Sequence, residues 1–138
     1  MLNSLGVGQR QKKSHLPNSI HSDTIYMVEP RRKNLVIYET VDGECPFDEW
    51  LGGLETSIVA RIRARLNRVA AGNLGDVKPV GGAVSELRLK FGSGYRIYFA
   101  NHGSEIIVLI SGGDKGSQYR DIQTAKKYWQ DFMRRNNA

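Results

Sequence analysis

The sequence predicts an α+β domain, and three patterns indicate this fold class. Short runs rich in β-branched and aromatic residues are typical of strands. Longer stretches repeat apolar residues every three or four positions, as helices with one buried face do. Glycine-rich segments separate these runs, as turns do. The predicted order is an N-terminal strand, two helices, an antiparallel sheet and a C-terminal helix.

The first 33 residues lack apolar periodicity and are rich in Gly, Ser, Asn, Pro and Lys. This composition favours a flexible basic tail. Met27 lies near the end of that tail, so a start at Met27 is an alternative to the upstream start. We therefore expect one folded domain at residues 34–138, a length that can bury a core.

The first patterned run, residues 35–40 (LVIYET), predicts a strand that ends at a turn formed by Asp42 and Gly43. Pro46 suits the first position of a short helix. The two glycines at 52 and 53 should end that helix, because glycine disfavours helix interiors.

A second helix is predicted over residues 55–71, where Gly72 can end it. Its apolar stripe consists of Ile58, Ile62, Leu66 and Val69. Three arginines fall together beside this stripe: Arg61, Arg65 and Arg68. Their spacing fits either a solvated basic face or part of an RNA-binding surface.

Residues 72–83 have the composition of a loop. Two alternating runs then flank Gly92, Ser93 and Gly94, which suit a three-residue hairpin turn. If Phe91 faces Tyr95, one face of the hairpin is apolar and carries Leu87, Leu89, Ile97 and Phe99. The other face then pairs Lys90 with Arg96 and Arg88 with Tyr98.

The next run, residues 105–110 (EIIVLI), predicts a strand covered on both faces. Gly112 and Gly113 are expected to form a tight turn after it. Residues 117–135 predict the last helix, whose buried side chains are Ile122, Ala125, Trp129 and Phe132.

The net charge of +6 is unevenly distributed along the 138 residues. Residues 34–58 carry six acids and no base, whereas residues 59–138 carry 14 Lys/Arg and six Asp/Glu. A basic excess on folded elements favours polyanionic partners, because binding releases counterions from phosphates.

Several classes of protein lack their signatures in this sequence. There is no H-E-x-x-H, no cysteine pair and no G-x-S-x-G, so neither a zinc site nor an acyl-transfer triad is expected. The glycines around Lys115 do not have the P-loop spacing. No metal or cofactor is expected. The single cysteine, Cys45, and the absence of long apolar runs indicate a cytoplasmic protein without membrane contact.

The predicted hairpin carries the candidate RNA-binding residues. Lys90 facing Arg96 is unfavourable unless solvent or an anion lies between them. An anion there would also meet Arg88 and the hydroxyl of Tyr98 on an open sheet face. Snorkelling of the long side chains into water is the alternative.

RNA cleavage by a ribose 2′-hydroxyl would need a proton acceptor, a proton donor and positive charge near the phosphate. Arg96 and Lys115 can supply charge, and Tyr98 or Tyr119 can donate a proton. No base is evident in the sequence.

The blocks "YETVDGECPFDEWLGGL", "RIRARLNRVAAGNLGDVKPVGGAVSELRL", "GSGYRIYF" and "LISGGDKGSQYRDIQTAKKYW", together with the order of elements, resemble the RelE/ParE toxin superfamily. The closest likeness is to its phage-related addiction module killer group, over about residues 34–135. This resemblance implies a RelE-like fold and a toxin of a type II toxin-antitoxin module. The implied partners are a cognate antitoxin, often a small helix-turn-helix protein, and the ribosome with its mRNA.

For the site, the resemblance implies a metal-independent endoribonuclease that inhibits translation. Arg96 and Lys115 stand at positions shared with the ribonucleases of the superfamily. Phe91 replaces an arginine expected before the hairpin turn. Asp121 stands near the position where the superfamily has a catalytic tyrosine, and Tyr119 could take the role of that tyrosine. Two other functions fit the same fold: ParE-like inhibition of DNA gyrase without catalysis, and RNA binding without toxicity.

Overall fold

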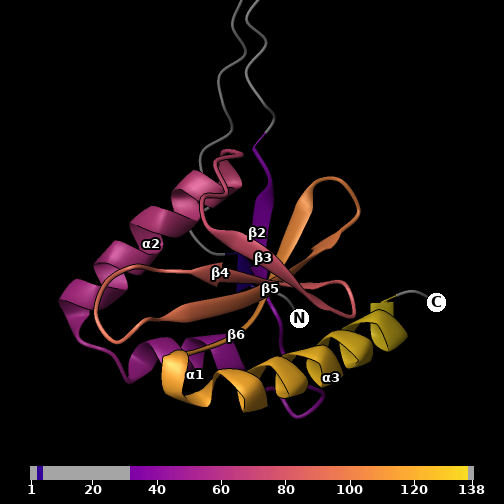
Figure 1. Cartoon of the computed structure of the whole chain (residues 1–138). Helices are drawn as coiled ribbons and strands as arrows, with labels where there is room; N and C mark the ends of the chain where they lie inside the picture. The colour runs from indigo at the N-terminus through magenta and orange to yellow at the C-terminus, as the bar shows by residue number, and fades with distance from the viewer. Residues whose placement is uncertain (1–2, 5–31, 137–138) are drawn as a thin grey trace, which may run out of the picture.

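The structure is a computed structural model that describes residues 3–4 and 32–136 (Figure 1). Its elements, in chain order, are β1 (Asn3–Ser4), β2 (Asn34–Ile37), α1 (Pro46–Gly52), α2 (Thr56–Ala70), β3 (Val77–Gly81), β4 (Val84–Arg88), β5 (Arg96–His102), β6 (Ile106–Gly113), the 3-10 turn η1 (Lys115–Ser117) and α3 (Gln118–Asn136). The α+β class predicted from the sequence is confirmed.

The strands form one sheet in the order β1-β2-β6-β5-β4-β3. β2 runs parallel to β6, and every other neighbouring pair is antiparallel. The prediction of an antiparallel sheet is therefore wrong at this one pair. The two helices between β2 and β6 belong to the long crossover that a parallel connection requires.

Helices cover both faces of the sheet, which gives three layers (Figure 1). On one face, α1 and α2 pack their apolar side chains against Leu35, Leu87, Ile97 and Leu109. On the other face, α3 packs Ala125, Trp129 and Phe132 against Val84, Tyr98, Ala100 and Val108. β6 is buried on both sides because it lies between these layers, as its apolar run predicted.

The predictions for the helices are confirmed almost to the residue. α1 begins at Pro46, as predicted. In α2, Ile62, Leu66 and Val69 are fully buried and Ile58 packs against the same core. The neighbouring arginine side of α2 is consequently turned away from the core.

β3 was missed, because residues 72–83 were expected to form a loop. Pro79 within it cannot donate a ladder hydrogen bond, and proline is tolerated only at sheet edges or bulges. β3 is the edge strand beside β4, and its pairing shifts between Pro79 and Gly81.

The predicted hairpin has the right faces and the wrong register. Arg88 pairs with Arg96 and Leu87 with Ile97, two positions away from the expected partners. The Leu89 amide donates to the Tyr95 carbonyl, so residues 90–94 close the loop. A shift of two residues keeps each side chain on its face, so Leu87, Leu89, Ile97 and Phe99 still form an apolar set.

Gly112 and Gly113 lie within β6 rather than in the turn predicted after it. A Cβ on Gly112 would overlap the Trp50 ring, and a Cβ on Gly113 would overlap the Asp121 carboxylate. These glycines are needed for close packing of α1 and α3 against the sheet end.

Most of the predicted tail lies outside the described residues, apart from Asn3 and Ser4 in β1 and residues 32 and 33. The first strand of the predicted domain, β2, begins at Asn34. Among the described helices, none combines the length and the apolar character needed to cross a membrane.

Candidate nucleic-acid interface

A groove of about 580 Å³ lies between α2 and the loop that follows β4. Five basic side chains and one carboxylate line it, together with Ala64, Leu89 and Phe91: Arg61, Arg65, Arg68, Arg88, Lys90 and Asp76. The arginines of α2 and the basic residues of the hairpin, predicted as separate groups, therefore share one surface. Such an accumulation of positive charge is suited to a polyanion.

Arg61 is held on the wall of this groove by an aromatic ring. Its guanidinium carbon lies 4.0 Å from the centroid of the Phe91 ring, a cation–π contact. Phe91 in turn packs beside Tyr95. The contact leaves Arg61 positioned and exposed, with donors available to an anion.

Arg65 has a structural role in addition to lining the groove. Its guanidinium donates to the carbonyls of Asn73 and Leu74, which ties the loop before β3 to α2. The loop passes close to this side chain, since a Cβ on Gly75 would overlap the guanidinium. Burial, followed by the neighbouring Arg68, lowers the pKa of Arg65.

Lys90 and Arg88 both face Asp76. The Lys90 ammonium is 3.6 Å from one carboxylate oxygen of Asp76, and Arg88 Nε is 3.8 Å from the other. Both distances exceed those of a hydrogen bond. The Lys90 side chain is 80% exposed, so it is available to a bound molecule.

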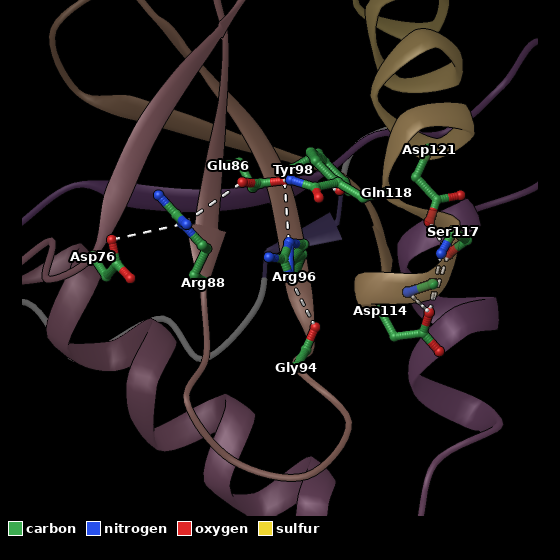
Figure 2. A network of polar contacts seen from close by, with 11 residues as sticks. Asp76, Glu86, Arg88, Gly94, Arg96, Tyr98, Asp114, Ser117, Gln118 and Asp121 are labelled. Carbon is green, nitrogen blue, oxygen red and sulfur yellow. Dashed lines mark hydrogen bonds and ion pairs between the residues drawn. The ribbon is translucent and has the colours of Figure 1, made fainter.

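Arg88 also leads into a buried polar network centred on Glu86 (Figure 2). Glu86 is fully buried, and its Oε2 accepts hydrogen bonds from Tyr98 Oη at 3.1 Å and Gln118 Nε2 at 2.8 Å. Arg96 Nε lies 3.4 Å from the same oxygen. The sequence suggested an external anion between Lys90 and a facing Arg96. In the structure Arg96 pairs with Arg88 instead, and the protein's own carboxylate lies near both arginines.

The prediction that Tyr98 lies on an open sheet face is wrong. α3 covers that face, Tyr98 is fully buried, and its hydroxyl is bonded to Glu86. Burial and the adjacent carboxylate both raise the pKa of Tyr98. Its ring cannot stack on a base from this position, and its role is to orient Glu86.

Arg96 and Lys115 both lie next to Gly94, at the end of the sheet. Arg96 is 8% exposed and donates to the Gly94 carbonyl at 3.2 Å. A Cβ on Gly94 would lie 3.4 Å from Lys115 Cβ and 3.7 Å from Arg96 Nη1. Both predicted charge-stabilising residues therefore border the same turn.

Tyr119 follows in the first turn of α3 and is 80% exposed. Asp114 holds η1 by accepting hydrogen bonds from the Gly116 and Ser117 amides, which fixes the backbone on both sides of Lys115. Asp121, the residue near the expected catalytic tyrosine, accepts a hydrogen bond from Ser117 Oγ and packs on Gly113. Its role is structural.

The candidate residues form two sets, which we name the basic groove (Arg61, Arg65, Arg68, Arg88, Lys90), whose members line one cavity, and the strand-end cluster (Arg96, Lys115, Tyr119), whose members lie in β5, η1 and the first turn of α3. The groove carries charges of the kind that bind phosphates without reading sequence in nucleic-acid-binding proteins. In the cluster the Lys115 side chain and the Tyr119 phenol are exposed, whereas Arg96 is almost fully buried and faces Glu86. In the part of the chain that the structure describes, no group of three His, Cys, Asp or Glu side chains could hold a metal ion.

Three residues that matter here were not predicted: Glu86, Gln118 and Asp76. Glu86 alternates with Arg88 and Lys90 along one strand, so its position on the polar face was visible in the sequence. Its burial was not, because that depends on α3 crossing the same face. Gln118 and Asp76 carry no local pattern that distinguishes them.

Fold and site together define an α+β domain with a basic groove at one end of a mixed sheet. No known protein-family profile matches the chain. A protein of Haemophilus influenzae described as "Uncharacterized protein" is 42% identical over 87 residues, which cover 62% of this chain and 88% of the relative. The chain belongs to the same family as that protein.

Proposed function

We propose that this chain is a RelE-like toxin of a type II toxin-antitoxin module that cleaves mRNA on the ribosome. The observation that carries the proposal is the convergence of five basic side chains from α2, β4 and the loop after β4 on one groove. The sequence blocks that resemble the RelE/ParE superfamily supply the class of substrate. Both lines of argument lead to a phosphodiester chain as the ligand.

The proposed reaction is attack of a ribose 2′-oxygen on the adjacent phosphorus. The bond from that oxygen to phosphorus forms, the bond from phosphorus to the 5′-oxygen breaks, and a 2′,3′-cyclic phosphate results. The 2′-hydroxyl loses a proton and the leaving 5′-oxygen gains one. Arg96 and Lys115 would stabilise the charge on phosphorus, and Tyr119 would donate the proton.

Because the residues of the strand-end cluster include no free base, we assign the uptake of the 2′-hydroxyl proton to no side chain of this protein. Glu86 is unsuited to it, since it is buried and its oxygens face Tyr98, Gln118 and two arginines. This arrangement is consistent with chemistry that is completed only on the ribosome.

The direct experiment adds purified protein to ribosomes translating a defined message and maps the ends of the mRNA by primer extension. Cleavage at codons in the ribosomal decoding site, absent without ribosomes, is the expected result. Co-expression of the protein encoded by the adjacent gene should abolish it, since a cytoplasmic toxin of this class needs a neutralising antitoxin. An intact message at every protein concentration would contradict the enzyme assignment.

A second candidate function is ParE-like inhibition of DNA gyrase without catalysis. The observation that favours it is the state of Arg96, which is almost fully buried and engaged with Glu86 rather than free for a substrate. Induction in cells separates the two functions. Gyrase-dependent DNA breaks with continuing protein synthesis would indicate the second, and loss of protein synthesis without breaks would indicate the first.

Removing charge from the groove is expected to weaken RNA binding. Arg61→Ala and Lys90→Ala should each lower the affinity for a single-stranded oligonucleotide and make its dependence on salt shallower, by about 0.7 in the log–log slope per lost phosphate contact. Fluorescence anisotropy over a salt series measures both quantities.

The matched control for this prediction is Arg63→Ala, which removes an exposed arginine of α2 that does not line the groove. It should leave the slope unchanged. Equal effects of Arg61→Ala and Arg63→Ala would mean that only the overall charge of the protein matters.

A further inference from the structure

Asp76 is the one carboxylate among the residues that line the basic groove. Its oxygens are divided between two cations, with Oδ1 near Arg88 Nε and Oδ2 near Lys90 Nζ. Arg88 Nε is buried and has no hydrogen-bond partner among the described residues. Arg88 and Lys90 therefore share one carboxylate, which forms a hydrogen bond with neither, and Arg88 Nε lies equally close to Glu86 Oε1, at 3.8 Å.

The backbone, rather than this carboxylate, holds Asp76 in place. The Asp76 carbonyl accepts a hydrogen bond from the Arg88 amide at 2.9 Å, and the Val77 amide donates to the Gly75 carbonyl at 3.1 Å. Arg65 fixes the preceding loop through Asn73 and Leu74. Release of the side chain from Arg88 and Lys90 would therefore require no movement of the loop.

The side chains around Asp76 are partly exposed, so a stronger anion could replace it by approaching Lys90 and the atoms of Arg88 other than the buried Nε. The Asp76 and Arg88 side chains are each more than a third exposed, and the Lys90 side chain is more exposed still. Ion pairs of this kind are weakened by solvent and salt. A phosphate, by contrast, can accept charge-assisted hydrogen bonds from Arg88 and Lys90 at once.

We propose that Asp76 is a competing anion that occupies the phosphate position between Arg88 and Lys90 until a phosphodiester chain displaces it. A ligand with a single phosphate must displace Asp76 and makes few other contacts in the groove. A chain that also reaches Arg61 and Arg68 gains further contacts for the same displacement. Asp76 would thus lower the affinity for a mononucleotide and for a phosphodiester chain by the same factor, so that a ligand needs the further contacts to bind well; this refinement rests on the proposed binding of RNA in the groove.

The test is Asp76→Asn, which keeps the size of the side chain and removes its charge. Affinity for a short single-stranded oligouridylate, measured by fluorescence anisotropy at low salt, is expected to rise about two- to fivefold, the size of one screened charge interaction. Uridine monophosphate, titrated as a competitor, should show a gain of about the same factor, because it displaces the same carboxylate. Asp76→Ala should behave in the same way and serves if the asparagine variant folds poorly.

Two controls make the result specific. Asp48→Asn changes the net charge equally at an exposed position of α1 that does not line the groove, and it should leave the affinity unchanged. In a protein that already carries Arg88→Ala and Lys90→Ala, Asp76→Asn should not raise the affinity for oligouridylate, because the two cations that Asp76 faces are gone.

An unchanged or lower affinity of Asp76→Asn would overturn the inference, since Asp76 would then orient Arg88 and Lys90 for the ligand. An equal gain from Asp48→Asn would also overturn it, because the effect would be one of total charge. Binding is measured without ribosomes, so a gain in a protein that leaves mRNA intact would refute the proposed reaction and uphold the role of Asp76. If wild-type protein binds no oligouridylate under any salt condition, the role of Asp76 is refuted, whereas the proposed reaction is judged by cleavage of mRNA on the ribosome.

Discussion

Replacing Glu86 with alanine is expected to lower the free energy of unfolding by about 3–5 kcal/mol, the range measured when one partner of a buried ion pair is removed. Glu86 is fully buried and Arg96 is 8% exposed, so the arginine would remain inside the protein without a counter-ion. The Tyr98 hydroxyl and the Gln118 amide would also lose their acceptor. Urea unfolding followed by circular dichroism measures the change.

Two comparison variants divide this loss into its parts. Gln118→Ala removes one hydrogen bond at the start of α3 and should cost about 1 kcal/mol. The double variant Glu86→Leu, Arg96→Met removes both charges and should recover much of the stability, because an apolar pair can replace a buried ion pair. A loss below about 1 kcal/mol for Glu86→Ala would mean that water already satisfies Arg96.

The same network bears on function, since it determines where two arginines point. Glu86 contacts Arg96 of the strand-end cluster and Arg88 of the basic groove, and Gln118 connects it to the helix that carries Tyr119 (Figure 2). The apolar double variant should therefore fold and yet fail to cleave RNA. Stability and activity would then be separated in one protein.

The helices were predictable because their signals are local. The start of α1 is marked by Pro46, and the buried face of α2 is marked by the spacing of its apolar residues. Both signals can be read along the chain without knowledge of the tertiary packing. The strand pairing depends on the loop between β4 and β5. A hairpin loop that is longer by two residues leaves every side chain on the same face of the sheet but gives it a different partner on the neighbouring strand. The faces were therefore predicted correctly and the partners were not.

The site could be predicted in its charges and not in its arrangement. Arg61 and Lys90 were each identified as candidates, but nothing in their spacing indicates that α2 and the end of β4 border one groove. Tyr98 was misplaced because the cover of α3 over its face is a property of the tertiary structure. Glu86 was not predicted as the partner of the arginines, because its burial beside them depends on the cover of α3 over the same face.

Lys115→Ala is expected to slow the cleavage of ribosome-bound mRNA by roughly ten- to a thousandfold, the range for removing one group that stabilises a transition state. Lys115 is exposed, and the backbone around it is held by Asp114, so the protein should keep its stability. Arg96→Ala would be harder to interpret, because it also leaves Glu86 buried without its arginine. Lys115 is therefore the cleaner test of charge at the strand end.

Single-turnover cleavage over a range of ribosome concentrations distinguishes catalysis from binding. If Lys115 acts on the transition state, the rate at saturation falls and the concentration for half-maximal rate stays nearly constant. Lys127→Ala, which removes an exposed lysine of α3, is the matched control and should cleave normally. A higher ribosome concentration for half-maximal rate, with an unchanged maximal rate, would instead assign Lys115 to binding, as for the groove residues. In that case the charge that stabilises the phosphate would have to come from Arg96 or from the ribosome.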